Sequence, residues 1–106
     1  MLQLLNNDAI KAEIEKLDDW IFDNHSLCIC KEWKFDSFRT AVNFFVAVGE
    51  LAEINNHHPE FISNYSKMKI SLTTHDVCGL THKDFDLAMK IDQLVRNDFS
   101  KYLKSD

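Results

Sequence analysis

The most unusual chemical feature of this sequence is a pair of adjacent histidines in the segment Glu53-Ile54-Asn55-Asn56-His57-His58-Pro59. Imidazole titrates near pH 6.5, so these side chains can give or take a proton at neutral pH. Glu53 precedes His57 by four residues, and on a helix two such side chains share one face. Pro59 cannot continue the helix, so the pair should lie at a chain reversal. The segment therefore predicts proton-transfer chemistry.

Two later residues are candidates for the same site. His75 follows residues 67–74, in which polar and apolar side chains alternate, so it is expected to end a strand, on the strand's polar face. Asp84 comes three residues after Thr81, the spacing of a helix capping box, which explains this carboxylate without any catalysis. A histidine at a strand end, two at a helix end and a carboxylate at a helix start could converge at one rim.

The elements that must position these residues can be predicted from periodicity. Helical spacing runs from Asn7 to Leu17, along 36–56, and from Thr81 to Tyr102. Period-two or short apolar runs predict strands at 20–22, 27–35, 61–65 and 67–74, with a turn at 23–26. The order is α-β-β-α-β-β-α. An α+β fold with the helices on one face of a four-stranded antiparallel sheet is the economical architecture, in a single domain spanning residues 1–106.

Composition excludes several classes of protein. The 106 residues carry a net charge of −5 and no basic run, which argues against nucleic-acid binding. No signal peptide is evident, and no window approaches the roughly 20 apolar residues of a membrane span. The odd count of three cysteines predicts reduced thiols in the cytoplasm, with Cys28 and Cys30 as small packing residues. His25 and His82 are expected at the surface.

The spacing of the candidate residues resembles that of the pterin-4a-carbinolamine dehydratase family. The matching residues are Glu53, His57-His58-Pro59, Tyr65, His75 and Asp84. The likeness extends over residues 20–99. Two positions depart from it: Asp19 stands where relatives often have Gly, and Lys83 stands where they often have Arg, which loses the bidentate fork of the guanidinium.

The resemblance implies an activity and its setting. The substrate would be 4a-hydroxytetrahydropterin, made by an aromatic amino-acid hydroxylase, and the products would be quinonoid dihydropterin and water. No metal or organic cofactor is expected. The fold would be a four-stranded antiparallel sheet with three helices on one face, and the protein would assemble as a homodimer or homotetramer. The expected catalytic residues are His57, His58 and His75, and the expected substrate-binding residues are Glu53, Asp84, Pro59 and Trp20.

Within that reading, His57 and His75 form the acid/base pair and His58 holds the substrate hydroxyl. Glu53 orients an imidazole or binds a ring N–H, and Asp84 supports His75 or the region of Lys83. Trp20 also fits an ordinary core position, and its place at the edge of the site is left open.

Two other hypotheses remain. Glu53 and the three candidate histidines include metal-ligand types, although adjacent side chains diverge and suit one ion poorly. A non-enzymatic interaction protein is the other possibility, because animal members of the family are dimerisation cofactors of a homeodomain transcription factor. The broadly apolar helix at 38–54 could serve such binding.

Overall fold

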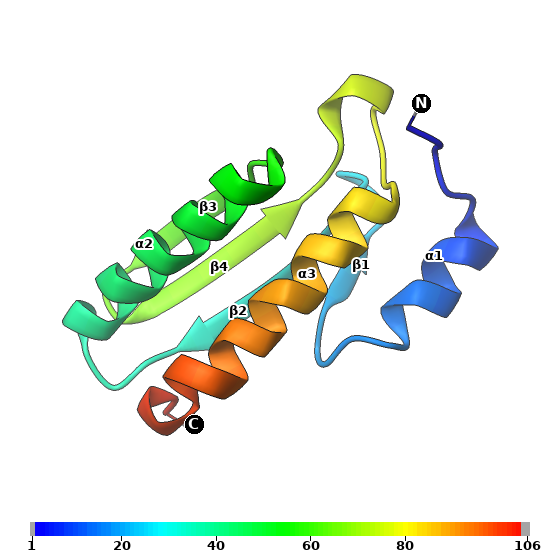
Figure 1. Cartoon of the computed structure of the whole chain (residues 1–106). Helices are drawn as coiled ribbons and strands as arrows, with labels where there is room; N and C mark the ends of the chain where they lie inside the picture. Colours follow the sequence, from blue (N-terminus) through cyan, green and yellow to red (C-terminus); the bar gives the residue numbers. More distant parts are fainter. Residues whose placement is uncertain (1, 105–106) are drawn as a thin grey trace.

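The computed structural model describes residues 2–104. The chain folds as two helices laid along one face of a four-stranded sheet, with a third helix beside one edge of the sheet (Figure 1). The helices and strands in chain order are α1 (Asn7–Ile14), β1 (Ile21–Asp23), β2 (Cys28–Lys34), α2 (Phe38–Asn55), β3 (Glu60–Asn64), β4 (Lys67–Leu72) and α3 (His82–Leu94). A 3-10 turn, His75–Val77, follows β4, and further helical turns, Val95–Phe99 and Ser100–Tyr102, follow α3. The predicted α+β order is confirmed.

The sheet has the strand order β1-β2-β4-β3, and each neighbouring pair is antiparallel. Ile29 pairs with Leu72 and Trp33 with Met68, so the apolar positions of the two central strands share one face. Helices α2 and α3 lie along that face, and α1 lies beside the β1 edge, from which Ile10 reaches the same core (Figure 1).

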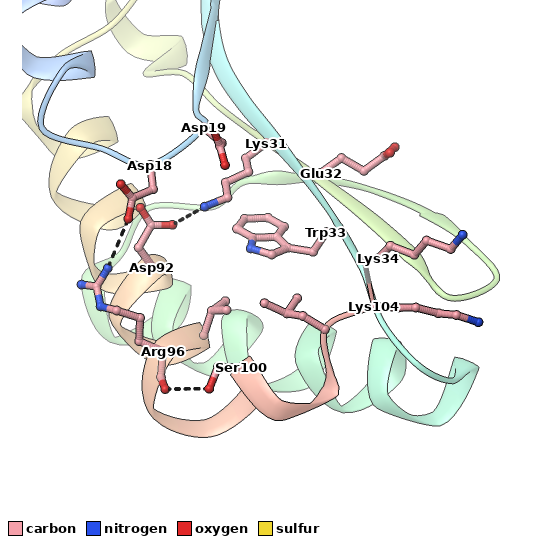
Figure 2. Close-up of a pocket in the computed structure, with 12 residues that line it drawn as sticks. Asp18, Asp19, Lys31, Glu32, Trp33, Lys34, Asp92, Arg96, Ser100 and Lys104 are labelled. Atoms are coloured by element: carbon pink, nitrogen blue, oxygen red, sulfur yellow. Dashed lines mark hydrogen bonds and ion pairs between the residues drawn. The ribbon is translucent and has the colours of Figure 1, made fainter. Parts of the chain in front are cut away.

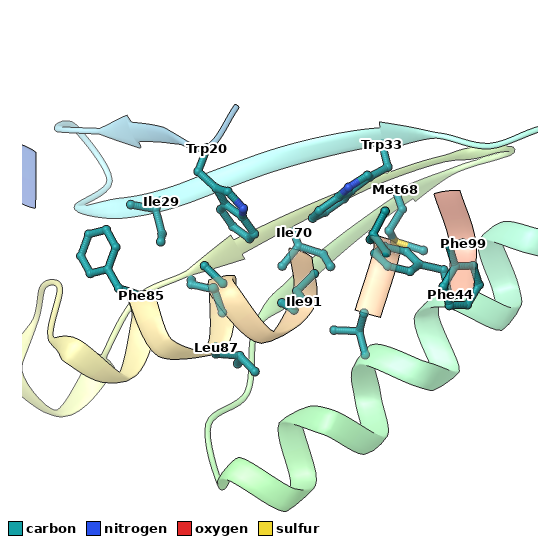
Figure 3. Close-up of a cluster of buried hydrophobic side chains, with 14 of the residues drawn as sticks. Trp20, Ile29, Trp33, Phe44, Met68, Ile70, Phe85, Leu87, Ile91 and Phe99 are labelled. Carbon is teal, nitrogen blue, oxygen red and sulfur yellow. The ribbon is translucent and has the colours of Figure 1, made fainter. Parts of the chain in front are cut away.

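Aromatic rings fill the core between the sheet and the helices (Figure 3). Phe44 of α2 contacts Trp33 of β2 with ring centroids 5.1 Å apart, and it contacts Phe99 at 5.3 Å. Phe35 and Phe44 are fully buried. Burying a side chain of this size contributes about 1.5–3 kcal/mol, so these contacts hold the helices in register with the strands.

The two tryptophans of the core differ in how their indole N–H groups are satisfied. Trp20 donates to both carboxylate oxygens of Asp92, at 3.0 and 3.1 Å. Trp33 is 4% exposed, and its indole nitrogen has no hydrogen-bond partner. Leaving a buried donor unpaired costs about 1–3 kcal/mol.

The ends of two predicted elements were wrong by two residues or more. The first helix ends at Ile14 rather than at Leu17, after which residues 15–19 form turns. Strand β4 ends at Leu72, so His75 does not end a strand. It begins the 3-10 turn instead, because a bridge between Thr74 and Gly79 closes a tight loop around it.

The N-terminal segment packs against this loop. The Leu5 N–H donates to the carbonyl of Leu80 at 2.9 Å. A Cβ atom placed on Gly79 would lie 2.5 Å from Cδ1 of Leu4, so Leu4 occupies the space that a larger residue at 79 would need. Within residues 2–104, no helix combines the length and the apolar character that crossing a membrane requires.

Candidate active site

The end of α2 sets the direction in which the histidine pair points. Asn56 adopts the left-handed conformation, with φ of 50° and ψ of 43°. The backbone N–H of His57 donates to the carbonyl of Ala52 at 3.1 Å, and that of Asn56 donates to Glu53 at 3.2 Å. These two bonds form a Schellman motif, which ends the helix sharply. His57 therefore leaves the helix surface and becomes buried, 9% exposed.

Asp84 is the most deeply buried acid of the site, with no exposed surface. Its Oδ1 lies 2.6 Å from Nε2 of His57. Its Oδ2 accepts from the backbone N–H of Thr81 at 2.9 Å and from the Thr74 hydroxyl at 2.8 Å. A carboxylate so placed only accepts, so Nε2 of His57 donates, and in the neutral ring Nδ1 is then left as an acceptor.

This geometry confirms one predicted contact of Asp84 and contradicts another. The capping box of Thr81 and Asp84 is present as expected. The same carboxylate supports His57 and not His75, because the left-handed Asn56 turns His57 towards the start of α3.

Two adjoining cavities bring the three predicted catalytic histidines together. The larger, of about 310 Å³, is lined by Leu2, Asn56, His57, His58, Thr73, Thr74, His75, Asp76 and Lys83. The smaller, of about 270 Å³, shares His58, Thr73 and His75 with it and adds Ser26, Cys28, Glu60 and Ser71. We call them together the histidine cleft. It presents imidazoles from two separate loops to the same space.

Glu53 lies near His58 and not His57. Its Oε1 is 3.5 Å from Nε2 of His58, and both side chains are mostly exposed. An exposed pair at this distance contributes little to stability. The expected four-residue contact between Glu53 and His57 was wrong, because the helix ends before His57.

None of the four predicted substrate-binding residues is part of the cleft lining, although Asp84 and Glu53 contact its histidines. Pro59 joins α2 to β3, and it fixes the chain where the histidine pair ends. Trp20 is 5% exposed and belongs to the core, where its N–H is taken by Asp92. The structure therefore assigns Trp20 a packing role and does not bring it to the histidines.

Sequence reasoning missed Thr74, which supports Asp84 from the loop before His75. The hydroxyls of Thr74 and Thr81 lie 2.8 Å apart, so the carboxylate and both hydroxyls form one buried network. No sequence signal separates Thr74 from neighbouring Thr73, because the contact depends on where β4 ends.

Cys28 forms part of the wall of the smaller cavity. Burial raises the pKa of its thiol, and the neighbouring Cys30 thiol raises it further. The Cys28 thiol therefore stays protonated at neutral pH and is a weak nucleophile. Among the described residues, no group of three or more His, Cys, Asp or Glu side chains is arranged to hold a metal ion.

Comparison with known proteins places these observations in context. Residues 3–94 match the family model described as Pterin 4 alpha carbinolamine dehydratase. A protein of that name from Prochlorococcus marinus is 41% identical over 97 residues, covering 92% of this chain and 100% of its own. Another, from Cyanothece sp., is 43% identical over 96 residues, covering 91% of this chain and 97% of its own.

A solved structure shares the fold. The crystal structure of a transcriptional coactivator/pterin dehydratase from Brucella melitensis superposes with a TM-score of 0.83 at 28% identity. The superposition covers 87% of this chain and 98% of the other.

Proposed function

This chain belongs to the pterin-4a-carbinolamine dehydratase family, and we propose that it eliminates water from a 4a-hydroxytetrahydropterin to give quinonoid dihydropterin. The observation that carries the proposal is the histidine cleft, where three imidazoles line two adjoining cavities and one of them is held by a buried carboxylate. The cleft is built from two loops, so substrate can lie between imidazoles that face it from different sides.

The reaction needs one acid and one base on opposite parts of the substrate. The bond between carbon 4a and its hydroxyl oxygen breaks, and the oxygen leaves as water once it is protonated. A ring N–H next to this carbon loses its proton, and the electrons of that N–H bond form the new C=N bond. Positioned general acids and bases contribute about 10²–10⁴-fold to such proton transfers.

His57 is suited to the role of base in this scheme. Asp84 holds Nε2 as a donor, which leaves Nδ1 able to accept the ring proton. The same carboxylate then stabilises the imidazolium that forms. His75 protonates the departing hydroxyl from the other loop, and His58 holds that hydroxyl in place. Glu53 assists His58 from the rim.

The test is a direct assay of the purified protein. Freshly made 4a-hydroxytetrahydropterin is added, and quinonoid dihydropterin is followed by its absorbance. We expect acceleration over the spontaneous reaction, a large loss in His57→Ala and in His75→Ala, and almost no turnover in the double variant. His25→Ala, in the exposed turn after β1, is the matched control and should keep full activity.

Full activity in the double variant would contradict the assignment of His57 and His75. If the unaltered protein did not accelerate the reaction, the proposed activity itself would be contradicted.

The setting we propose is the cytoplasm, alongside an aromatic amino-acid hydroxylase that produces the carbinolamine and reuses the recycled pterin. We also propose a homodimer or homotetramer, because α2 exposes large apolar side chains: Phe38, Phe45, Val46 and Ile54. The same exposed surface of α2 favours a second candidate function: the protein could act as a non-enzymatic dimerisation cofactor that binds a partner protein through α2. That function predicts partner binding that survives the loss of His57 and His75.

A further inference from the structure

A cavity of about 330 Å³, which we call the β2–α3 pocket, has no histidine in its lining (Figure 2). Its walls come from residues 31–34 of β2, from Asp92 of α3, and from Arg96 and Leu103 beyond α3. Asp92 lies eight residues after Asp84, which corresponds to about 12 Å of helix. No step of the proposed reaction uses this pocket.

The pocket contains a buried donor that nothing in the protein satisfies. The indole nitrogen of Trp33 is the one buried side-chain polar atom within residues 2–104 that lacks a hydrogen-bond partner. The ring centroids of Trp20 and Trp33 lie 5.7 Å apart, and the indole N–H of Trp20, unlike that of Trp33, donates to Asp92. Buried N–H groups are almost always bonded to protein or to an ordered water, so that of Trp33 marks a place where an acceptor from outside the chain, a water or a ligand atom, binds.

Asp92, the nearby buried carboxylate, is already engaged. Its Oδ1 accepts from Trp20 at 3.0 Å and from the Lys31 ammonium at 3.2 Å. These contacts fix the carboxylate on the side of the pocket next to Trp20. Within the described residues the Trp33 indole therefore has no acceptor and is available to a molecule in the pocket.

The charges around the pocket favour a ligand with a single negative charge. Arg96 lies 3.8 Å from Asp18, and both side chains are mostly exposed, so this ion pair is weak and the guanidinium can turn to a better anion. Lys34 and Lys104 also line the pocket, and its four cationic side chains are balanced by the four carboxylates of Asp18, Asp19, Glu32 and Asp92. The pocket therefore lacks the excess of positive charge that a phosphate or another multiply charged anion needs.

The surfaces beside the donor are apolar. The Trp33 ring and Val95 both line the pocket, and the Lys31 ammonium lies 5.2 Å from the centre of that ring. In Figure 2 the indole occupies the middle of the pocket, between Arg96 and Lys104. A flat, apolar ligand body would pack against Val95 and Leu103, because the Trp33 ring itself is only 4% exposed and is already contacted by Trp20 and Lys31.

We propose that the β2–α3 pocket binds a small aromatic carboxylate, which accepts from the Trp33 indole and pairs with Arg96. The indole nitrogen is covered in this structure, so the ligand reaches it when rim side chains move aside. Arg96 and Leu103 are both exposed enough to do so. Binding here is independent of the histidine cleft.

The test follows the two indole N–H signals of ¹⁵N-labelled protein by NMR during titration with phenylacetate. The Trp33→Phe variant identifies which signal belongs to Trp33. We expect a saturable shift of the Trp33 signal, and a much smaller shift with phenylacetamide, which has the same body without the charge. Equal shifts with both compounds, or no saturable shift of the Trp33 signal, would overturn the proposal.

Two variants separate the ligand contacts from folding. Arg96→Gln should weaken phenylacetate binding about tenfold, the effect of losing one charged hydrogen bond, while Lys101→Gln, exposed and outside the pocket, should not. Trp33→Phe should abolish the saturable binding while the protein stays folded, although the smaller ring leaves a cavity in the core and lowers the melting temperature. Saturable phenylacetate binding that persists in folded Trp33→Phe would overturn the inference.

Discussion

At the scale of single residues, the contact between Asp84 and His57 distinguishes a built proton-transfer site from three histidines that merely lie close together. Asp84 is fully buried and its two oxygens receive donors from three residues: His57, Thr74 and Thr81. Removing the charge while keeping the shape should therefore affect the chemistry more than the fold.

Asp84→Asn tests this directly. The amide can donate to Nε2 of His57, which favours the wrong tautomer, so we expect kcat to fall roughly 10²–10⁴-fold with little change in KM. Steady-state kinetics of carbinolamine dehydration measure both kcat and KM. Asp98→Asn, an exposed acid beyond the same helix, is the control. An equal fall in both variants would show that the loss does not come from the His57 contact.

At the scale of the elements, the end of α2 depends on the backbone of one residue. Asn56 has positive φ, and a β-branched residue there costs about 1–3 kcal/mol of strain. Asn56→Val should lower the melting temperature and also reduce turnover of the folded protein, because His57 and His58 follow directly. Asn56→Gly accepts the same conformation and should keep both stability and activity. Thermal unfolding and kcat distinguish the two variants. If both variants had the same melting temperature and the same kcat, the role of the left-handed cap would be contradicted.

The turn between β1 and β2 gives a prediction for pH. Asp23 accepts from the backbone N–H groups of Ser26 and His25, at 3.2 and 2.9 Å, and these bonds hold the pKa of its carboxyl below the ordinary value. A lowered folded-state pKa means that the stabilisation is present above the unfolded pKa and is lost as pH falls through the folded pKa. Asp23→Ala should therefore be less stable at neutral pH, with the difference closing in acid. Denaturant unfolding at several pH values measures the difference in unfolding free energy between Asp23→Ala and the unaltered protein. A difference that stays constant with pH would exclude ionisation of Asp23 as the cause.

At the scale of the whole molecule, the exposed apolar side chains of α2 predict self-association. Val46 is 52% exposed and Phe45 46%, on the helix face turned away from the core. We expect analytical ultracentrifugation to find a dimer or tetramer, and Val46→Glu to yield a smaller species. Asn97→Glu, at an exposed position after α3, should leave the assembly unchanged. A monomer in the unaltered protein would contradict the proposed assembly.

The sequence predicted the arrangement of this fold better than the contacts within its site. Alternation along residues 67–74 and the capping box at Thr81 are local patterns. The helix start formed as predicted, and the strand formed but ends two residues early, at Leu72. The partner of His57 was mistaken because helical spacing carries no sign of the single left-handed residue at 56. The partner of Trp20, Asp92, lies 72 residues away, and no local pattern connects them.

The close approach of Leu4 to Gly79 has an evolutionary consequence. A side chain at position 79 and a leucine at position 4 compete for the same space, on the loop that begins with His75. Leu4 is 54% exposed and the atom in the way is the end of its side chain, so the leucine can turn aside at little cost. Relatives can therefore carry alanine or serine at position 79 without displacing the imidazole on the same loop.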